Sequence, residues 1–139
     1  MTSTIENKQE LAQIIRRSQS QTTFDVAQVV FKMYEGQYKC ASIQNNTWYC
    51  LVDGRWKSTD SGISLMKKIS NEVLNEYLKM ISHYNQIAYD NDDDVRDQAC
   101  ECAKNLTDVT YKLRDLHFRQ DILGELCILF YDEYFIPSL

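Results

Sequence analysis

The sequence predicts a mainly α fold of the α+β class: a long antiparallel helical hairpin plus further helices, with a small three-stranded antiparallel β-meander. Two long stretches in the second half repeat apolar residues at helical spacing. Between residues 38 and 58, three short segments alternate in polarity and are separated by turn residues. The length of 139 residues suits one domain.

Residues 1–22 are polar and predict an N-terminal segment or linker, so the domain is placed over residues 23–139. Within the polar segment, a short helical pattern is formed by Ile5, Leu11, Ile14 and Ile15. The stretch TTFDVAQVVFKMYEG then predicts a helix, because Thr22 or Thr23 offers an N-cap and Gly36 a stop.

Three strands are predicted next, in YKCASI, TWYCLV and RWKS. The first two are joined around Asn45, and the last two by Asp53-Gly54, because Asn, Asp and Gly tolerate the positive φ of tight hairpins. Alternation in the middle strand puts on one face Trp48, Cys50 and Val52, and on the other Tyr49 and Leu51.

Two long helices should follow the meander. The first, over residues 63–90, has the apolar stripe Met66, Ile69, Val73, Tyr77, Met80, Tyr84 and Ile87. Asp92 or its neighbour caps the second, whose heptad seam is Val95, Ala99, Cys102, Leu106, Val109, Leu113 and Leu116. The short connection favours an antiparallel hairpin of these two helices, and an intermolecular coiled coil is the alternative.

A last helix is predicted over residues 119–134, with apolar positions Ile122, Leu126, Leu129 and Phe130. The chain then ends in DEYFIPSL, where Pro137 cannot continue a helix. Apolar residues stand at the end of this stretch, namely Phe135, Ile136 and Leu139. They lead us to expect that the polypeptide goes on.

The net charge of −5 is unevenly distributed. Residues 31–68 carry six cations and three anions, a net +3, whereas residues 69–139 carry six cations and fourteen anions, a net −8. A polyanion should therefore meet the first half. No apolar run is long enough for a membrane span, and five cysteines without a disulfide framework predict reduced thiols in an intracellular protein.

No constellation for catalysis is evident, so no catalytic residue, metal ligand or cofactor is predicted. The four glycines form no phosphate loop, and no serine has the glycine spacing of a nucleophile turn. His83 and His117 lack neighbours at ligand spacing. The run NDDDVRD has the composition of a metal site, but acidic residues at a helix start are typical of a solvated cap.

The meander carries the best candidates for binding. Single-stranded nucleic acids are held by aromatic platforms and by cations along the backbone. The candidates for nucleic-acid binding are Lys39, Trp48, Tyr49, Arg55, Trp56 and Lys57. The alternative is that both tryptophans pack the meander onto the helices, with the cations on its wet face.

The order of these segments resembles the region immediately upstream of the helicase in poxvirus-type primase-helicases of large nucleocytoplasmic DNA viruses and some phages. The resemblance covers roughly residues 24–139, from VVFKMYEGQYKC through NNTWYCLVDGRWKSTD to FYDEYFIPSL. The family kernel W-Y-x-(L/F)-x-D/G-G-x-W is matched by Trp48, Tyr49, Leu51, Gly54 and Trp56.

In that family a primase domain precedes this region and a superfamily-three hexameric ATPase follows it. The resemblance implies a non-catalytic module for viral genome replication that assists DNA engagement or hexamer assembly. Its implied partners are single-stranded DNA and the rest of the primase-helicase chain, in the host cytoplasm or nucleus. ATP and Mg²⁺ would belong to the ATPase domain, because Walker motifs and primase carboxylates are missing from this sequence. The alternative is a protein-interaction module whose acidic hairpin docks replication partners without DNA contact.

Overall fold

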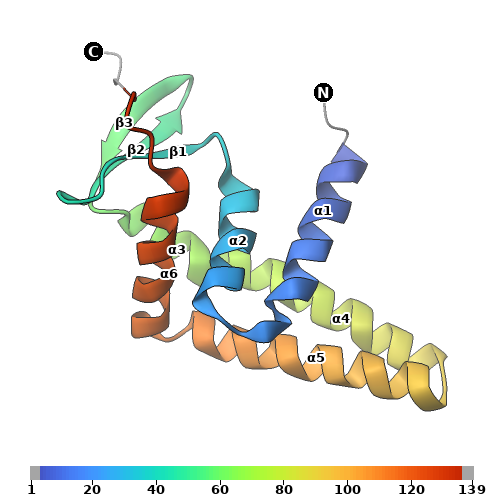
Figure 1. The fold of residues 1–139 in the computed structure, drawn as a ribbon. Helices are drawn as coiled ribbons and strands as arrows, with labels where there is room; N and C mark the ends of the chain where they lie inside the picture. The colour runs from blue at the N-terminus through green and yellow to red at the C-terminus, as the bar shows by residue number, and fades with distance from the viewer. Residues whose placement is uncertain (1–3, 136–139) are drawn as a thin grey trace.

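The computed structural model describes residues 4–135, most of which are helical (Figure 1). The helices are α1 (Thr4–Arg17), α2 (Thr23–Tyr34), α3 (Ile63–Lys68), α4 (Leu74–Asp90), α5 (Asp93–Leu113) and α6 (Leu116–Phe130). Two short turns are η1 (Ser18–Ser20), which is 3₁₀, and η2 (Ile69–Val73), which is π-helical. The strands are β1 (Tyr38–Ser42), β2 (Thr47–Val52) and β3 (Arg55–Thr59). The predicted mainly α, α+β class is confirmed.

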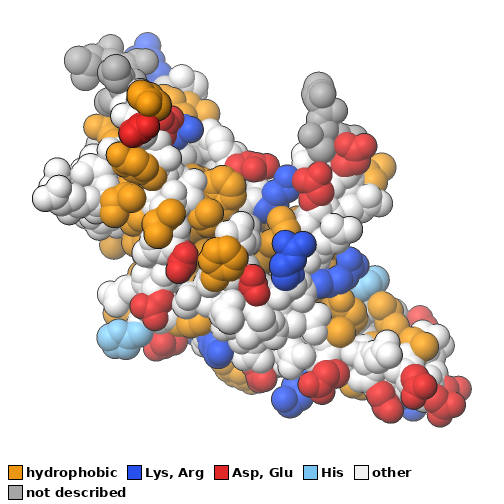
Figure 2. Space-filling view, viewed as in Figure 1, with side chains coloured by type: hydrophobic (Ala, Val, Ile, Leu, Met, Phe, Trp, Pro, Cys, Tyr) orange, Lys and Arg blue, Asp and Glu red, His pale blue; other side chains and the backbone are white. Residues whose placement is uncertain are grey.

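Helices α4 and α5 form the predicted antiparallel hairpin along the base of the molecule (Figure 1). Most seam positions are buried, as predicted, namely Ala99, Leu106, Val109 and Leu113. Val95 is exposed and Leu116 belongs to α6, so the seam is shorter than expected. Acidic side chains gather at the outer end of the hairpin, and residues 89–98 are all exposed there (Figure 2).

The predicted helix over residues 63–90 is present as α3, η2 and α4 in direct succession. Sequence periodicity did not indicate the π-turn in its middle. A π-turn is rare in helices and often marks a functional position. It places Glu72 beside the C-terminal end of α2, where the Tyr34 hydroxyl donates to Glu72 Oε1 at 2.7 Å.

Helix α1 occupies most of the stretch expected to be a polar segment or linker. Its Ile15 is buried in the common core, and Ser18 in η1 is buried too. The Ser18 hydroxyl donates to the Ile15 carbonyl and lies 2.7 Å from the Tyr77 hydroxyl of α4. These contacts fix the connection between α1 and α2 against the helical hairpin.

Side-chain caps determine two helix starts. The Thr22 hydroxyl accepts from the Asp25 amide at 3.2 Å, as the sequence predicted for α2. Helix α6 begins at Leu116 rather than at residue 119, because the Asp115 carboxylate accepts from the Phe118 amide at 3.1 Å.

The end of α6 also differs from the prediction. The helix stops at Phe130 instead of residue 134, because Tyr131 is extended and lies in a parallel bridge with Cys40. The Asp132 amide donates to the Cys40 carbonyl at 3.2 Å, which aligns the segment after α6 with the edge of β1. Ile136, Pro137 and Leu139 lie outside the described residues.

The meander pairs as predicted, with β2 between β1 and β3. Asp53 and Gly54 have φ angles of 51° and 76°, and Val52 pairs with Arg55 across this two-residue turn. Both turn residues therefore adopt the left-handed region that tight hairpins require. One sheet face packs on α2 and α6 through three buried side chains, Tyr38, Cys40 and Trp48. Within residues 4–135, we find no helix with the length and apolarity needed to span a membrane.

Candidate nucleic-acid interface

Trp48 belongs to the core. Its side chain is 0% exposed, and the indole lies 5.9 Å from Phe130 in an edge-to-face arrangement. The indole Nε1 donates to Asn46 Oδ1 at 2.9 Å, so its one polar group is satisfied. A ring enclosed in this way has no free face on which a nucleobase could stack.

The chain also fits closely around this indole at Gly62, which precedes α3. Gly62 has φ +80°, and a Cβ there would lie 3.2 Å from Trp48 Nε1 and 3.0 Å from Leu123 Cδ1. Glycine fits here because it tolerates the positive φ and has no Cβ that would crowd these two side chains. The inner face of the sheet is therefore built for packing.

Tyr49 and Trp56 lie on the opposite, outer face of the sheet, where Trp56 pairs with Leu51. Phe135 from the segment after α6 packs on both rings, with centroid distances of 5.3 Å to Tyr49 and 5.1 Å to Trp56. All three rings are half-buried. Two of the three aromatic candidates thus share the outer face, and the chain itself covers part of both rings.

Lys39 shares the outer face with Tyr49, its cross-strand partner. Its Nζ lies 3.4 Å from Asp132 Oδ2, and both side chains are 33% exposed. The pair joins β1 to the segment after α6, as the bridge to Tyr131 also does. This cation on the outer face is therefore partly neutralised.

Arg55 and Lys57 lie on the inner side of the sheet, because they pair with Val52 and Cys50. Both are exposed at the open edge of β3. Among residues 4–135, no carboxylate lies within 4.0 Å of either side chain. The structure thus separates these two unpaired cations from the exposed parts of Tyr49 and Trp56. The nucleic-acid role of these residues stays a prediction.

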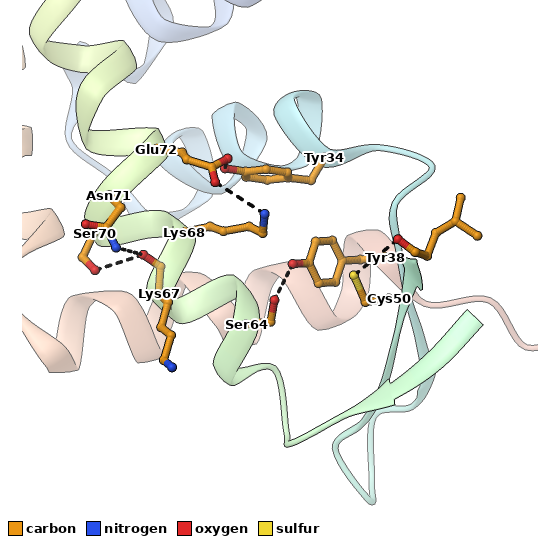
Figure 3. Close-up of polar contacts among 10 residues, drawn as sticks. Tyr34, Tyr38, Cys50, Ser64, Lys67, Lys68, Ser70, Asn71 and Glu72 are labelled. Atoms are coloured by element: carbon orange, nitrogen blue, oxygen red, sulfur yellow. Dashed lines mark hydrogen bonds and ion pairs between the residues drawn. The ribbon is translucent and has the colours of Figure 1, made fainter. Parts of the chain in front are cut away.

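A polar network lies at the junction of α2 with η2 (Figure 3). The Tyr34 hydroxyl donates to Glu72, and Lys68 Nζ lies 3.5 Å from Glu72 Oε2 and 5.2 Å from the Tyr34 ring centroid. The hydrogen bond from Tyr34 lowers the pKa of Glu72, while burial raises the pKa of Tyr34 well above its ordinary value. Near neutral pH, the phenol is protonated and the carboxylate ionised, so the pair is suited to anchoring rather than to proton transfer.

Tyr38 lies on the other side of the same junction. Its hydroxyl is 2.7 Å from Ser64 Oγ on α3, and burial raises the pKa of Tyr38 to about 12. The contact fastens the sheet to α3. As with Tyr34, the phenol keeps its proton near neutral pH.

The thiols offer no reactive group in the core. Cys40 and Cys127 are buried side by side, and burial raises the pKa of both, that of Cys127 to about 11. A thiol with a raised pKa is a poor nucleophile and a poor ligand at neutral pH. Over the described range, no group of three His, Cys, Asp or Glu side chains is placed to hold a metal ion.

Sequence reasoning missed the placement of three residues near the meander. Phe135 was recognised as apolar, but its place on Tyr49 and Trp56 depends on a long-range contact that no local pattern encodes. Lys67 and Lys68 entered only through net charge, although their position on an amphipathic helix could have placed them beside the sheet.

Comparison with known proteins gives one viral similarity. No protein-family model matches the chain. It is 28% identical over 126 residues to a protein of Acanthamoeba polyphaga mimivirus named "Putative helicase L207/L206". The match takes in 91% of this chain and 13% of the mimivirus protein, so the chain spans a small part of that relative's length.

Proposed function

We propose that this chain is a non-catalytic module of a viral DNA-replication primase-helicase, lying between the primase and ATPase domains and assisting DNA engagement or assembly of the motor. The observation that carries the proposal is the similarity of 91% of this chain to 13% of a helicase-named viral protein. Such proportions suit a module within a much larger polypeptide.

Two features of the structure support a non-catalytic role. The titratable groups at the junction of α2 with η2, Tyr34 and Glu72, hold protonation states that suit anchoring. The segment after α6 is fastened to the sheet by Asp132 and Phe135. A firm exit from the domain would transmit force or orientation to a following motor domain.

A replacement experiment in the mimivirus relative tests the proposal. The segment that matches this chain is either deleted or exchanged for this chain, and ATP hydrolysis and strand separation are measured. We expect deletion to abolish strand separation while ATP hydrolysis persists, and the exchange to restore strand separation. Full strand separation after deletion would contradict the proposal, as would ATP hydrolysis by this chain alone.

The second candidate is a protein-interaction module without DNA contact. It is favoured by the outer end of the α4–α5 hairpin, where residues 89–98 are all exposed and rich in aspartate. Sedimentation of the chain alone and with basic replication proteins would test it. A hairpin variant with Asp92, Asp93 and Asp94 changed to Asn should lose any complex that forms there.

A further inference from the structure

Three surface hollows lie in a row beside α3, η2 and α4. The first, of about 440 Å³, is lined by Thr59, Ser64, Lys67 and Asn71 among others. The second, of about 570 Å³, shares Lys68 and Glu72 with the first. The third, of about 470 Å³, shares Lys8 and Leu11 with the second. Because neighbouring hollows share lining residues, the three adjoin one another, and we call this row of hollows the α3–α4 trough.

One face of a single long helix forms the floor of the trough. Floor residues recur every three or four residues, singly or as adjacent pairs, in the order Ser64, Lys67 and Lys68, Asn71 and Glu72, Glu76, Lys79 and Met80, and His83. Side chains at this spacing lie on the same side of a helix. From Ser64 to His83, at the helical rise per residue, the floor is about 28 Å long. Helices α1 and α2 and the connection after β3 supply the walls.

The trough is basic on an acidic molecule. Its lining contains six Lys or Arg and four Asp or Glu side chains, a net +2, whereas the whole chain carries −5. Figure 2 shows basic side chains where α1 approaches α4, far from the acidic end of the hairpin. An extended polyanion would therefore be drawn to this side.

Three cations along the trough are available for a ligand. Lys67, Lys8 and Arg16 have no carboxylate within 4.0 Å among the described residues. Lys67 extends away from the helix, and no contact is drawn to its Nζ in Figure 3. Arg16 is oriented by a 3.1 Å hydrogen bond from its Nε to the Tyr84 hydroxyl, which leaves its terminal nitrogens free. These cations are distributed over all three hollows.

A buried hydroxyl lies next to the first hollow. Thr59 Oγ1 is buried and has no hydrogen-bond partner within the part of the chain that the structure describes. A buried hydroxyl without a partner costs free energy unless a ligand or water satisfies it. Because this oxygen is closed to solvent, it does not contribute to ligand binding in the hollow.

We propose that the α3–α4 trough binds the sugar-phosphate backbone of single-stranded nucleic acid. We choose a single strand because a recessed surface presents no helix or ribbon that could enter a duplex groove for base readout. Its length suits the lower part of the range of about 4–16 nucleotides covered by single-strand sites. The identity of the polyanion rests on the proposed function.

Fluorescence anisotropy of the full chain with a labelled oligothymidylate tests the trough. The main variant combines Lys8→Glu, Arg16→Glu and Lys67→Glu, and a second combines the same positions with Gln to guard against misfolding. We expect affinity to fall roughly tenfold or more, and the slope of log affinity against log salt to flatten by about 2. Thermal unfolding of each variant verifies that it is folded.

A matched control carries the same change in net charge outside the trough, with Arg17→Glu, Lys104→Glu and Arg114→Glu. It should keep most of the affinity. A comparable loss in the control would overturn the proposal, because binding would then follow the overall field of the protein.

A third variant, with Arg55→Glu and Lys57→Glu, tests the edge of the sheet instead. If this variant alone loses binding, the trough is refuted. The same holds if the native chain fails to bind at low salt, or if polyglutamate competes as well as unlabelled oligothymidylate. None of these binding results depends on the strand-separation assay that tests the proposed function. The trough proposal and the proposed function can therefore fail independently of each other.

Discussion

Trp48 and Trp56 stand on neighbouring strands of one small sheet and have opposite surroundings. Trp48 is fully buried between the sheet and α6, with its Nε1 bonded to Asn46. Trp56 lies on the outer face, half-buried, against a ring that comes from the segment after α6. The hydrophobic core encloses Trp48, whereas Trp56 is covered by one ring from the segment after α6.

The difference between the two tryptophans reflects the different packing of the inner and outer faces of β2 and β3. The inner face holds the meander on the helices through contacts that are distributed over α2, α3 and α6. The outer face depends on few groups, namely Phe135 and the pair of Lys39 with Asp132. Local opening is expected where few buried contacts hold a segment. The outer face is therefore held by fewer contacts than the inner face.

The largest expected effect is the loss of the inner tryptophan. Trp48→Ala removes a fully buried ring and should lower the free energy of unfolding by about 3–5 kcal/mol. Trp56→Ala removes a half-buried ring and should cost about 1–2 kcal/mol. Urea denaturation followed by circular dichroism measures both. Equal losses would mean that the two faces of the sheet contribute alike.

A smaller effect is expected for the ring that covers the outer face. Phe135→Ala should expose Trp56 and shift its fluorescence to longer wavelength, while Trp48 keeps its buried signal. A double-mutant cycle of Phe135→Ala with Trp56→Ala should give a coupling of about 0.5–1.5 kcal/mol. A Trp48→Phe background removes the second indole and assigns the fluorescence to Trp56. No change in that emission would show that Phe135 does not cover the ring in solution.

The sequence predicted those parts of the structure that depend on local signals. Alternation in β2 separated Trp48 from Tyr49, and the Asp53-Gly54 pair predicted the two-residue turn. Alternation alone could not say which face meets the helices, because both faces of β2 carry large side chains. That choice is made by Phe130, which contacts Trp48 from a helix remote in sequence.

Long-range contacts also explain the other differences. Ile15 is buried because η1 holds the end of α1 against the helical hairpin. The polar composition of the first residues gave no indication of this packing. The Asp132–Cys40 hydrogen bond ends α6 early, but pairing between distant segments has no local pattern. The sequence identified the candidate cations only through an excess of positive charge over residues 31–68. The pairing register of the strands was needed to assign Lys39 to one face of the sheet and Arg55 and Lys57 to the other.

A still smaller effect is expected from the ion pair on the outer face. A double-mutant cycle of Lys39→Ala with Asp132→Ala should give a coupling of about 1 kcal/mol or less, because both side chains are partly exposed. The coupling should weaken as salt is raised. The Lys104–Asp108 pair, at 3.9 Å on the surface of α5, provides a comparison that should couple less. If salt leaves the coupling unchanged, the Lys39–Asp132 pair is more buried in solution than its exposed fractions indicate.

The smallest expected effect concerns Glu72, whose contact with Tyr34 adjoins the inner side of the sheet through Tyr38. Its pKa is lowered on folding, chiefly by the hydrogen bond from Tyr34. The resulting stabilisation is therefore present above the unfolded pKa of about 4.3 and is lost as pH falls through the lower folded pKa. Because Glu72 is well exposed, screening by water should keep it below about 0.5 kcal/mol.

Glu72→Gln should accordingly flatten the acid side of the stability profile, and Tyr34→Phe should do the same while leaving the carboxylate in place. Glu76→Gln on the following helix provides the control, because Glu76 pairs with the exposed Lys79 and, among the described residues, no phenol donates a hydrogen bond to it. Urea denaturation between about pH 3 and pH 6 covers the range in which a carboxyl group with a lowered pKa titrates. If Tyr34→Phe leaves the slope unchanged while Glu72→Gln flattens it, Lys68 rather than Tyr34 stabilises the charge, and the pH dependence arises from an ion pair within the α3–η2 segment.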